Sequence, residues 1–250
     1  MIVVLQKNTT FSSNVTTHEK QLVVILQPMK VIITAATLLE IKPLVEHLAT
    51  VADLITGHEY SIKHHTVKVV IGGVGMMATA YNVGKEIIMY QPQLVIQAGI
   101  AGSFDRNLQL GDVVQITSET LGDLGVEDNL VVKDMFEIGL LKENEAPFTG
   151  NQLINPHQLP YFNFPGVKGV TVNLVSGSIP TIERLEKAYQ PSIESMEGAA
   201  FHYVCIQEQV PFVQLRSISN YVEIRDKSKW NIPLAVQSLN KALTGFIDQL

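Results

Sequence analysis

Short apolar runs rich in β-branched residues recur along this chain, and each leads through small residues into a helical pattern. Residues 31–33 are followed by the small residues 34–37, and residues 67–71 by the glycine-rich turn 72–75. β-branched residues favour buried strands, and strands that alternate with helices favour a sheet covered on both faces. The sequence therefore predicts an α/β fold of three layers, α/β/α, with a central, mainly parallel or mixed twisted sheet.

The same criteria place the other elements. Further strands are expected at residues 58–65, 94–97, 110–116, 169–175 and 210–215, and further helices at residues 182–189, 195–208 and 234–250. Residues 98–103 contain two glycines and are expected to form a loop. Residues 119–169 are rich in loops and in aromatic residues, which either line a site and stack on a planar ligand or simply pack together: Phe136, Phe148, Phe162 and Phe164.

Length and charge narrow the classes of protein to consider. The 250 residues allow one large domain, expected at 29–250, while the polar, Ser- and Thr-rich start makes 1–28 an appendage. A net charge of −6 argues against a nucleic-acid partner. The single cysteine, Cys205, excludes an internal disulfide and suggests inert packing in a reducing compartment. No apolar run approaches the roughly 18 residues of a membrane span, so a cytoplasmic protein is expected.

The turn at residues 72–75 raises the question of a dinucleotide cofactor. Gly73, Gly75 and Ala78 match the pattern G-x-G-x-x-A between a strand and a helix. However, no acidic residue ends the next strand, Leu94 to Gln97, where one would bind a ribose diol. None of the seven histidines has metal-ligand spacing either. We therefore expect neither a cofactor nor a metal.

Two glutamates occupy the first turns of predicted helices. Glu40 follows strand 31–33, with Thr37 as the expected N-cap, and Glu197 precedes a run of small residues, with Ser195 as the expected N-cap. In open α/β sheets, ligands bind beyond the carboxyl ends of the strands. Each glutamate is thus either a solvated first-turn residue or a ligand-binding residue, and the local pattern does not decide between them.

Five motifs in this order resemble the purine nucleoside phosphorylase/nucleosidase superfamily. They are the strand before Glu40, the turn 72–75, Gly99-Ile100-Ala101-Gly102, Met196-Glu197-Gly198-Ala199-Ala200 and Arg216-Ser217-Ile218-Ser219-Asn220. Within it, residues 29–250 are most similar to the methylthioadenosine/S-adenosylhomocysteine nucleosidase branch. Residues 220–226 and Trp230 resemble the futalosine hydrolases, which act on the route to menaquinone.

The resemblance implies roles for several of these residues. Glu197, with Met196 beside it, corresponds to the glutamate that binds the ribose hydroxyls, where a carboxylate favours an oxocarbenium-like transition state. Glu40 corresponds to the carboxylate that polarises the attacking water. Arg216 and Ser219 correspond to groups near that water and the base. The matching glycine-rich turns make Gly75, Ala101 and Gly102 substrate-binding residues as well.

Asn220 departs from the pattern of the adenine-cleaving nucleosidases, which carry an aspartate that protonates N7. Asparagine cannot protonate a leaving group, but its Oδ1 accepts from a protonated N7 and its Nδ2 donates to a 6-oxo group. Asn220 therefore favours hypoxanthine or guanine over adenine. Ile100 is a second departure, because the methylthioadenosine enzymes tend to have a serine there that helps to hold the water.

The arginines bear on the choice between water and phosphate as the nucleophile. The superfamily's phosphorylases bind phosphate with arginines from the N-terminal half, and this chain has none before Arg106. Water is therefore favoured. Arg225, or the nearby Lys227 and Lys229, either pairs with the carboxylate of a futalosine-type benzoate tail or belongs to an ordinary surface charge run.

The expected function is hydrolysis of the N-glycosidic bond of futalosine, which releases hypoxanthine, in a homo-oligomer with a small-molecule nucleoside as its partner. The alternatives are a nucleosidase for methylthioadenosine/S-adenosylhomocysteine or aminodeoxyfutalosine, a nucleoside-binding protein without catalysis, and a dinucleotide-dependent oxidoreductase.

Overall fold

The computed structural model describes residues 28–129, 131–157 and 162–250, and the predicted appendage 1–28 lies outside them apart from Pro28. The elements in chain order are β1 Lys30–Ala35, α1 Leu38–Val51, β2 Asp53–Thr56, β3 Glu59–Ile62, β4 His65–Ile71, α2 Met76–Tyr90, β5 Leu94–Ser103, β6 Val113–Leu121, β7 Gly125–Asp128, β8 Val131–Asp134, β9 Leu153–Ile154, β10 Gly166–Thr171, α3 Ile179–Tyr189, β11 Ile193–Ser195, α4 Gly198–Gln207, β12 Phe212–Tyr221, the 3-10 turn η1 Lys227–Lys229, and α5 Ile232–Gln249.

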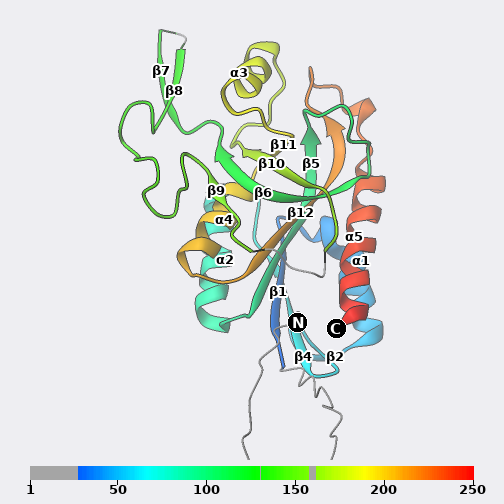
Figure 1. Ribbon diagram of the computed structural model, residues 1–250. Helices are drawn as coiled ribbons and strands as arrows, with labels where there is room; N and C mark the ends of the chain where they lie inside the picture. The colour runs from blue at the N-terminus through cyan, green and yellow to red at the C-terminus, as the bar shows by residue number, and fades with distance from the viewer. Residues whose placement is uncertain (1–27, 130, 158–161) are drawn as a thin grey trace, which may run out of the picture.

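A central mixed sheet lies between two helical layers, as the sequence predicts. Helices α1 and α5 cover one face and α2 and α4 cover the other (Figure 1). The strand order is β11-β10-β6-β12-β5-β1-β4-β3-β2, with β9 paired to β6. The three-layer α/β/α expectation is confirmed. No helix within the described residues is long and apolar enough to cross a membrane.

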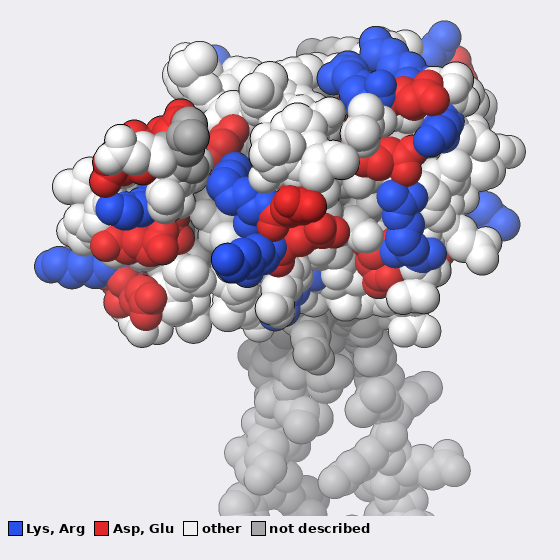
Figure 2. Space-filling view, turned by 90° about the horizontal axis from the view of Figure 1, so that it is seen from above, with Lys and Arg blue, Asp and Glu red and all other residues white. Residues whose placement is uncertain are grey.

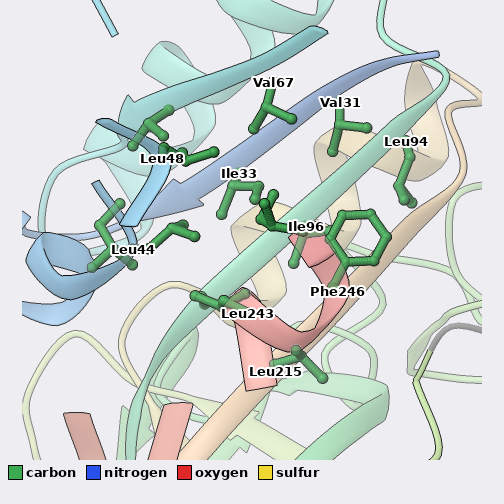
Figure 3. Packing of buried hydrophobic residues seen from close by; sticks show 14 of the residues in the cluster. Val31, Ile33, Leu44, Leu48, Val67, Leu94, Ile96, Leu215, Leu243 and Phe246 are labelled. Carbon is green, nitrogen blue, oxygen red and sulfur yellow. The ribbon is translucent and has the colours of Figure 1, made fainter. Parts of the chain in front are cut away.

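The side chains of β1, β4 and β5 form the core beneath α1 and α5. Figure 3 shows Val31, Val67 and Ile96 in one cluster with Leu44 of α1 and Phe246 of α5. A second apolar cluster lies under α2 and α4 and contains Cys205, which is fully buried; burial raises the pKa of its thiol. The expectation that Cys205 packs in the core is confirmed.

One half of the sheet closes on itself. β5 pairs in parallel with β12, β12 pairs with β6, β6 with β10 and β10 with β11, and the short β11 then pairs antiparallel with the end of β5. We call these five strands the ring. An apolar cluster drawn from four of them includes Ala101, Ile116, Ile193 and Ile218.

The structure corrects several predicted boundaries. Residues 98–103 are not a loop but the second half of β5, held by pairing with β12. Likewise, residues 216–221 continue β12 rather than follow it. The region 119–169, expected to be mostly loop, also holds the hairpin β7–β8, the strand β9 and the start of β10.

The four phenylalanines of that region divide into two packed pairs. Phe162 stacks on Phe246 of α5 at 5.2 Å between ring centroids, and Phe164 packs against the same core. Phe136 and Phe148 meet edge to face at 5.1 Å. The packing interpretation therefore holds for Phe162 and Phe164, whose rings are part of the core and not of a lid.

Candidate active site

Several predicted site side chains converge on the second half of β5, where three other elements place them. α1 contributes Glu40, the segment between β11 and α4 contributes Glu197, and β12 contributes Arg216. All three side chains are buried, at 9%, 5% and 1% exposure. These three residues and Gln97 of β5 are referred to below as the Glu–Arg cluster. A solvated first-turn role for either glutamate is thereby excluded.

Glu40 is fixed at both carboxylate oxygens. Its Oε2 accepts hydrogen bonds from the backbone N–H of Thr37 at 3.0 Å and from the Thr37 hydroxyl at 3.1 Å, so Thr37 is the N-cap that the sequence predicts. Its Oε1 accepts from the N–H of Ile100 at 3.2 Å. A carboxylate offers about four acceptor positions, so one remains for a water molecule in front of β5.

Glu197 takes a different place from the one expected. It is itself the N-cap residue of α4, and Ser195, the expected N-cap, is the last residue of β11. The reason is tertiary: residues 193–195 pair with β10 and β5, so the chain stays extended up to Ser195. The Ser195 hydroxyl still accepts from the N–H of Gly198 at 3.3 Å, within hydrogen-bond reach of the helix start.

The Glu197 carboxylate joins two parts of the chain that are distant in sequence. Its Oε1 accepts from the N–H of Gly75 at 3.1 Å, and its Oε2 pairs with Nη1 of Arg216 at 3.3 Å. Gly75 has φ +86°, a backbone conformation that residues other than glycine rarely adopt. In this conformation its N–H points at the Glu197 carboxylate. The glycine turn thus binds a carboxylate of the protein itself, which argues against a dinucleotide phosphate at this turn.

Arg216 is the fully buried cation of the cluster. Besides Glu197, it donates from Nη1 to the carbonyl of Ile100 at 3.4 Å and from Nη2 to Oε1 of Gln97 at 3.0 Å. The guanidinium lies directly over Gly99, where no side chain would fit. Glu40 approaches the same glycine, since a Cβ there would lie 3.1 Å from its Oε1. Gly99 is therefore the point at which the two side chains converge.

Ser219 and Asn220 lie at the end of β12, beside the end of β5. The Ser219 hydroxyl is within 3.2 Å of the Ala101 carbonyl and 2.8 Å of Asn220 Oδ1, and Asn220 Nδ2 donates to the Tyr221 carbonyl at 3.0 Å. Asn220 packs against Gly102, whose added Cβ would lie 3.1 Å from Nδ2. The amide is thus oriented, with one N–H and one lone pair left for a ligand.

Two predicted site residues differ from this group. Met196 is half-buried next to Glu197. Arg225 is exposed and stacks over Trp230 at 5.5 Å, whereas its neighbour Lys229 pairs with Glu223 at 2.9 Å, as does Arg106 at 3.0 Å. The view from above shows such positive and negative side chains next to one another on this face (Figure 2).

Sequence reasoning missed Gln97 and Glu119. Gln97 is a polar residue in an otherwise apolar strand, a signal that could have found it. Glu119, on β6, is fully buried next to the cluster. Burial raises the pKa of its carboxyl to about 7, against hydrogen bonds from Gln214 and Thr171 and the charge of Arg216, which lower it.

Two surface hollows within the described residues, of about 320 and 290 Å³, share no residue with the Glu–Arg cluster. Within the described residues, no group of His, Cys, Asp and Glu side chains is placed to hold a metal ion. The candidate site is therefore defined by its converging polar groups, which suit a ligand with several hydroxyls and a hydrogen-bonding ring.

Comparisons with known proteins show the family to which the chain belongs. The model of a family described as the phosphorylase superfamily matches residues 30–248. The chain is 26% identical over 200 residues to a 5'-methylthioadenosine/S-adenosylhomocysteine nucleosidase of Glaesserella parasuis, covering 76% of this chain and 84% of that protein. It is 28% identical over 188 residues to a futalosine hydrolase of Thermus thermophilus, covering 68% and 76%.

Solved structures show the same fold. The futalosine hydrolase of Helicobacter pylori superposes with a TM-score of 0.73 at 19% identity, over 89% of this chain and 98% of that one. A 5'-methylthioadenosine/S-adenosylhomocysteine nucleosidase of the same organism, complexed with a pyrrolopyrimidine ligand, also gives 0.73 at 19% identity, over 90% and 100%. Relatives with two different substrates therefore resemble the chain about equally.

Proposed function

The chain belongs to the phosphorylase superfamily and is an N-glycosyl hydrolase, and from this premise we propose that it hydrolyses futalosine and releases hypoxanthine. The observation that carries the choice of substrate is Asn220, whose amide is held by Ser219 and Tyr221 at the end of β12. An amide cannot protonate a leaving purine, but it can bind a 6-oxopurine through one acceptor and one donor. Adenine release would instead call for an acid at this position.

The Glu–Arg cluster supplies the rest of the proposed reaction. Glu197 retains acceptor positions for the 2′- and 3′-hydroxyls, and its charge stabilises the positive ribosyl transition state. Glu40 holds the attacking water and takes its proton as the bond to C1′ forms. Arg216 keeps Glu197 oriented. Ala101 and Gly102 form the β5 wall beside the base, and Gly75 secures Glu197 from the other side.

Water rather than phosphate is the proposed nucleophile. Arg216 is the arginine within the cluster, and its Nη1 and Nη2 donate to Glu197, Ile100 and Gln97. A phosphate dianion would have to displace these contacts, and bidentate arginine contacts are what such an anion favours.

Arg225 is the proposed partner of the benzoate carboxylate of futalosine. It follows Asn220 by five residues on the segment that leaves β12, and its Cβ lies 3.5 Å from the position of a Cβ on Gly177. Stacking on Trp230 orients the guanidinium at the surface, where a carboxylate can reach it.

A homo-oligomer remains part of the proposal. Met77, Tyr81 and Ile88 of α2 are 88%, 69% and 61% exposed and share one face of the helix by their spacing. Large exposed apolar surfaces mark association sites. Light scattering of the purified protein tests this, and a monomer at working concentration would refute it.

A product assay tests the main proposal. Purified protein is given futalosine, aminodeoxyfutalosine, methylthioadenosine or inosine, each with and without phosphate. Hypoxanthine should be released from futalosine fastest, and in phosphate-free buffer. An absolute phosphate requirement would refute hydrolysis, and faster adenine release from methylthioadenosine would establish the alternative nucleosidase.

A further inference from the structure

A further buried carboxyl group lies next to the Glu–Arg cluster and takes no part in the proposed reaction. Glu119 of β6 is fully buried. The Thr171 hydroxyl donates to its Oε2 at 2.9 Å and itself accepts from the N–H of Ala199 at 2.7 Å. On the other side, the amide of Gln214 lies 2.8 Å from Glu119 Oε1. The carboxyl is therefore enclosed by β10, β12 and the start of α4.

Two glycines close the space around this carboxyl. A Cβ built on Gly169 would lie 2.6 Å from Glu119 Oε1, and a Cβ built on Gly198 would overlap the same oxygen and lie 2.5 Å from Gln214 Nε2. The group is thus packed directly against backbone. Burying a carboxylate away from water costs free energy unless a cation pairs with it. The cation near Glu119 is Arg216, which is already paired with Glu197.

The far side of Gln214 faces a buried histidine. His202 of α4 is fully buried, and its Nδ1 lies 3.0 Å from the carbonyl of Leu153. A carbonyl only accepts, so Nδ1 carries a hydrogen. The side chains of His202 and Gln214 interact, yet among the described residues neither Nε2 of His202 nor Oε1 of Gln214 has a hydrogen-bond partner.

The positions of the protons resolve this conflict. The two ends of a glutamine amide have the same shape, and their assignment follows from the hydrogen bonds they make. With the Gln214 amide reversed, its NH₂ donates to a neutral His202 Nε2 and its oxygen accepts from Glu119. That oxygen needs a donor, so Glu119 must be a carboxylic acid.

A charged arrangement with the same number of protons is the alternative. In it, His202 is a cation that donates to Gln214 Oε1, and Glu119 is a carboxylate that accepts from Gln214 Nε2. It places two charges in the interior where the neutral arrangement places none. Burial lowers the pKa of His202 to about 4, although its hydrogen bond to the Leu153 carbonyl raises it. Burial raises the pKa of Glu119 to about 7. The proton therefore resides on Glu119.

We propose that Glu119 is a neutral carboxylic acid, linked through a reversed Gln214 amide to a neutral His202, and that it acts as a positioning residue for Glu197. The charged and titratable groups that face Glu119 are Arg216 on β12, Glu197 at the head of α4 and His202 on α4. While Glu119 is neutral, Arg216 keeps its ion pair with Glu197. Ionised Glu119 competes for Arg216 and repels Glu197, which loosens the proposed ribose anchor.

Spectroscopy tests the proton position without any substrate. Infrared difference spectra between the wild type and Glu119→Gln at pH 6 should contain the carbonyl stretch of one protonated carboxylic acid, which disappears in the wild type well above pH 7. Nitrogen NMR of His202 should show a neutral ring with the hydrogen on Nδ1. An ionised Glu119 together with a cationic His202 at pH 6 would overturn the proposal.

Kinetic measurements test the positioning role. This is the only part of the proposal that rests on the proposed function. The wild-type KM for the nucleoside should rise about threefold or more from pH 6 to pH 8, as expected for one ionising group with a pKa near 7. Glu119→Gln keeps a neutral donor and acceptor in place, so its KM should stay flat over this range while kcat is retained.

Glu194→Gln is the matched control. Glu194 is a second buried glutamate whose pKa is raised by burial, but it accepts from the backbone N–H and hydroxyl of Ser176 instead of facing Arg216. The pH-dependent rise in KM should persist in this variant. The same rise in Glu119→Gln would overturn the positioning role. If no nucleoside is cleaved, the proposed function fails, whereas the spectroscopic result still decides the proton position.

Discussion

Replacing Gly99 with alanine perturbs the Glu–Arg cluster without changing any of its polar groups. Gly99 pairs with Arg216 in the β5–β12 register. A Cβ at this position would overlap Nη1 of Arg216 and would lie 3.2 Å from its Cζ and 3.1 Å from Oε1 of Glu40. Because Arg216 is 1% exposed, the guanidinium has no route to solvent and must shift within the core.

The expected size of the effect follows from these contacts. Ordinary van der Waals contacts of a Cβ begin at 3.4 Å, so the guanidinium must shift by several tenths of an ångström or more. The hydrogen bonds from Arg216 Nη1 to Glu197 and to the Ile100 carbonyl are already 3.3 and 3.4 Å long. A further increase in these distances would break them. Overpacking of this kind costs about 1–3 kcal/mol of stability. Misplacing a site group by about 1 Å costs about 10²-fold in rate.

The assay is kcat/KM for futalosine hydrolysis, measured beside denaturant unfolding of the same preparation. Gly245→Ala is the control, because Gly245 lies in α5 and a Cβ there meets nothing within 4 Å. It should leave the rate unchanged and raise stability by about 0.5–1 kcal/mol, the usual gain from removing a helical glycine. A Gly99→Ala protein that folds and turns over at the wild-type rate would refute the view that close packing over Gly99 positions Arg216.

Five further substitutions test individual side chains. Glu197→Gln and Glu40→Gln should each lower kcat by about 10²-fold or more with the fold intact by circular dichroism; near-normal turnover would remove that residue from the mechanism. Asn220→Asp should raise adenine release relative to hypoxanthine release in a product assay, and an unchanged ratio would contradict the role of the amide. Arg225→Ala should raise KM for futalosine but not for inosine, and equal effects on the two would argue against a contact with the benzoate tail. For Glu119→Gln, the measurement is the free energy of unfolding against pH. Because burial raises the native pKa of Glu119 from 4.5 to about 7, its contribution to the free energy of unfolding is fully present below pH 4.5 and is lost as pH rises to 7. The wild type should therefore lose roughly 3 kcal/mol relative to the variant over this range. Parallel curves of unfolding free energy against pH for the two proteins would contradict the raised pKa.

Local chemistry made part of this site predictable. The spacing of Thr37 and Glu40 is a helix-capping pattern, and the cap forms as expected because all its atoms lie within one turn. The alternation of strands and helices likewise predicted the three layers.

The parts that sequence reasoning missed depend on distant partners. Glycines 99 and 102 suggested a loop, but the strand needs them because the side chains of Arg216 and Asn220 occupy the space where a Cβ would be. Strict alternation along β6 would place Glu119 on the same face as Gln115 and Thr117, and the packing of β10, β12 and the start of α4 against its carboxyl buries it. Three-residue β11 is too short for any periodicity to predict.

The closed ring also governs when the site can form during synthesis. β5 must wait for β11, about 90 residues later, and for β12, which ends at Tyr221. Before residue 193 has been made, the second half of β5 lacks both partners, and neither Glu197 nor Arg216 exists. A nascent chain that ends before residue 197 lacks both Glu197 and Arg216 of the proposed site, so activity should appear only after β12 has left the ribosome.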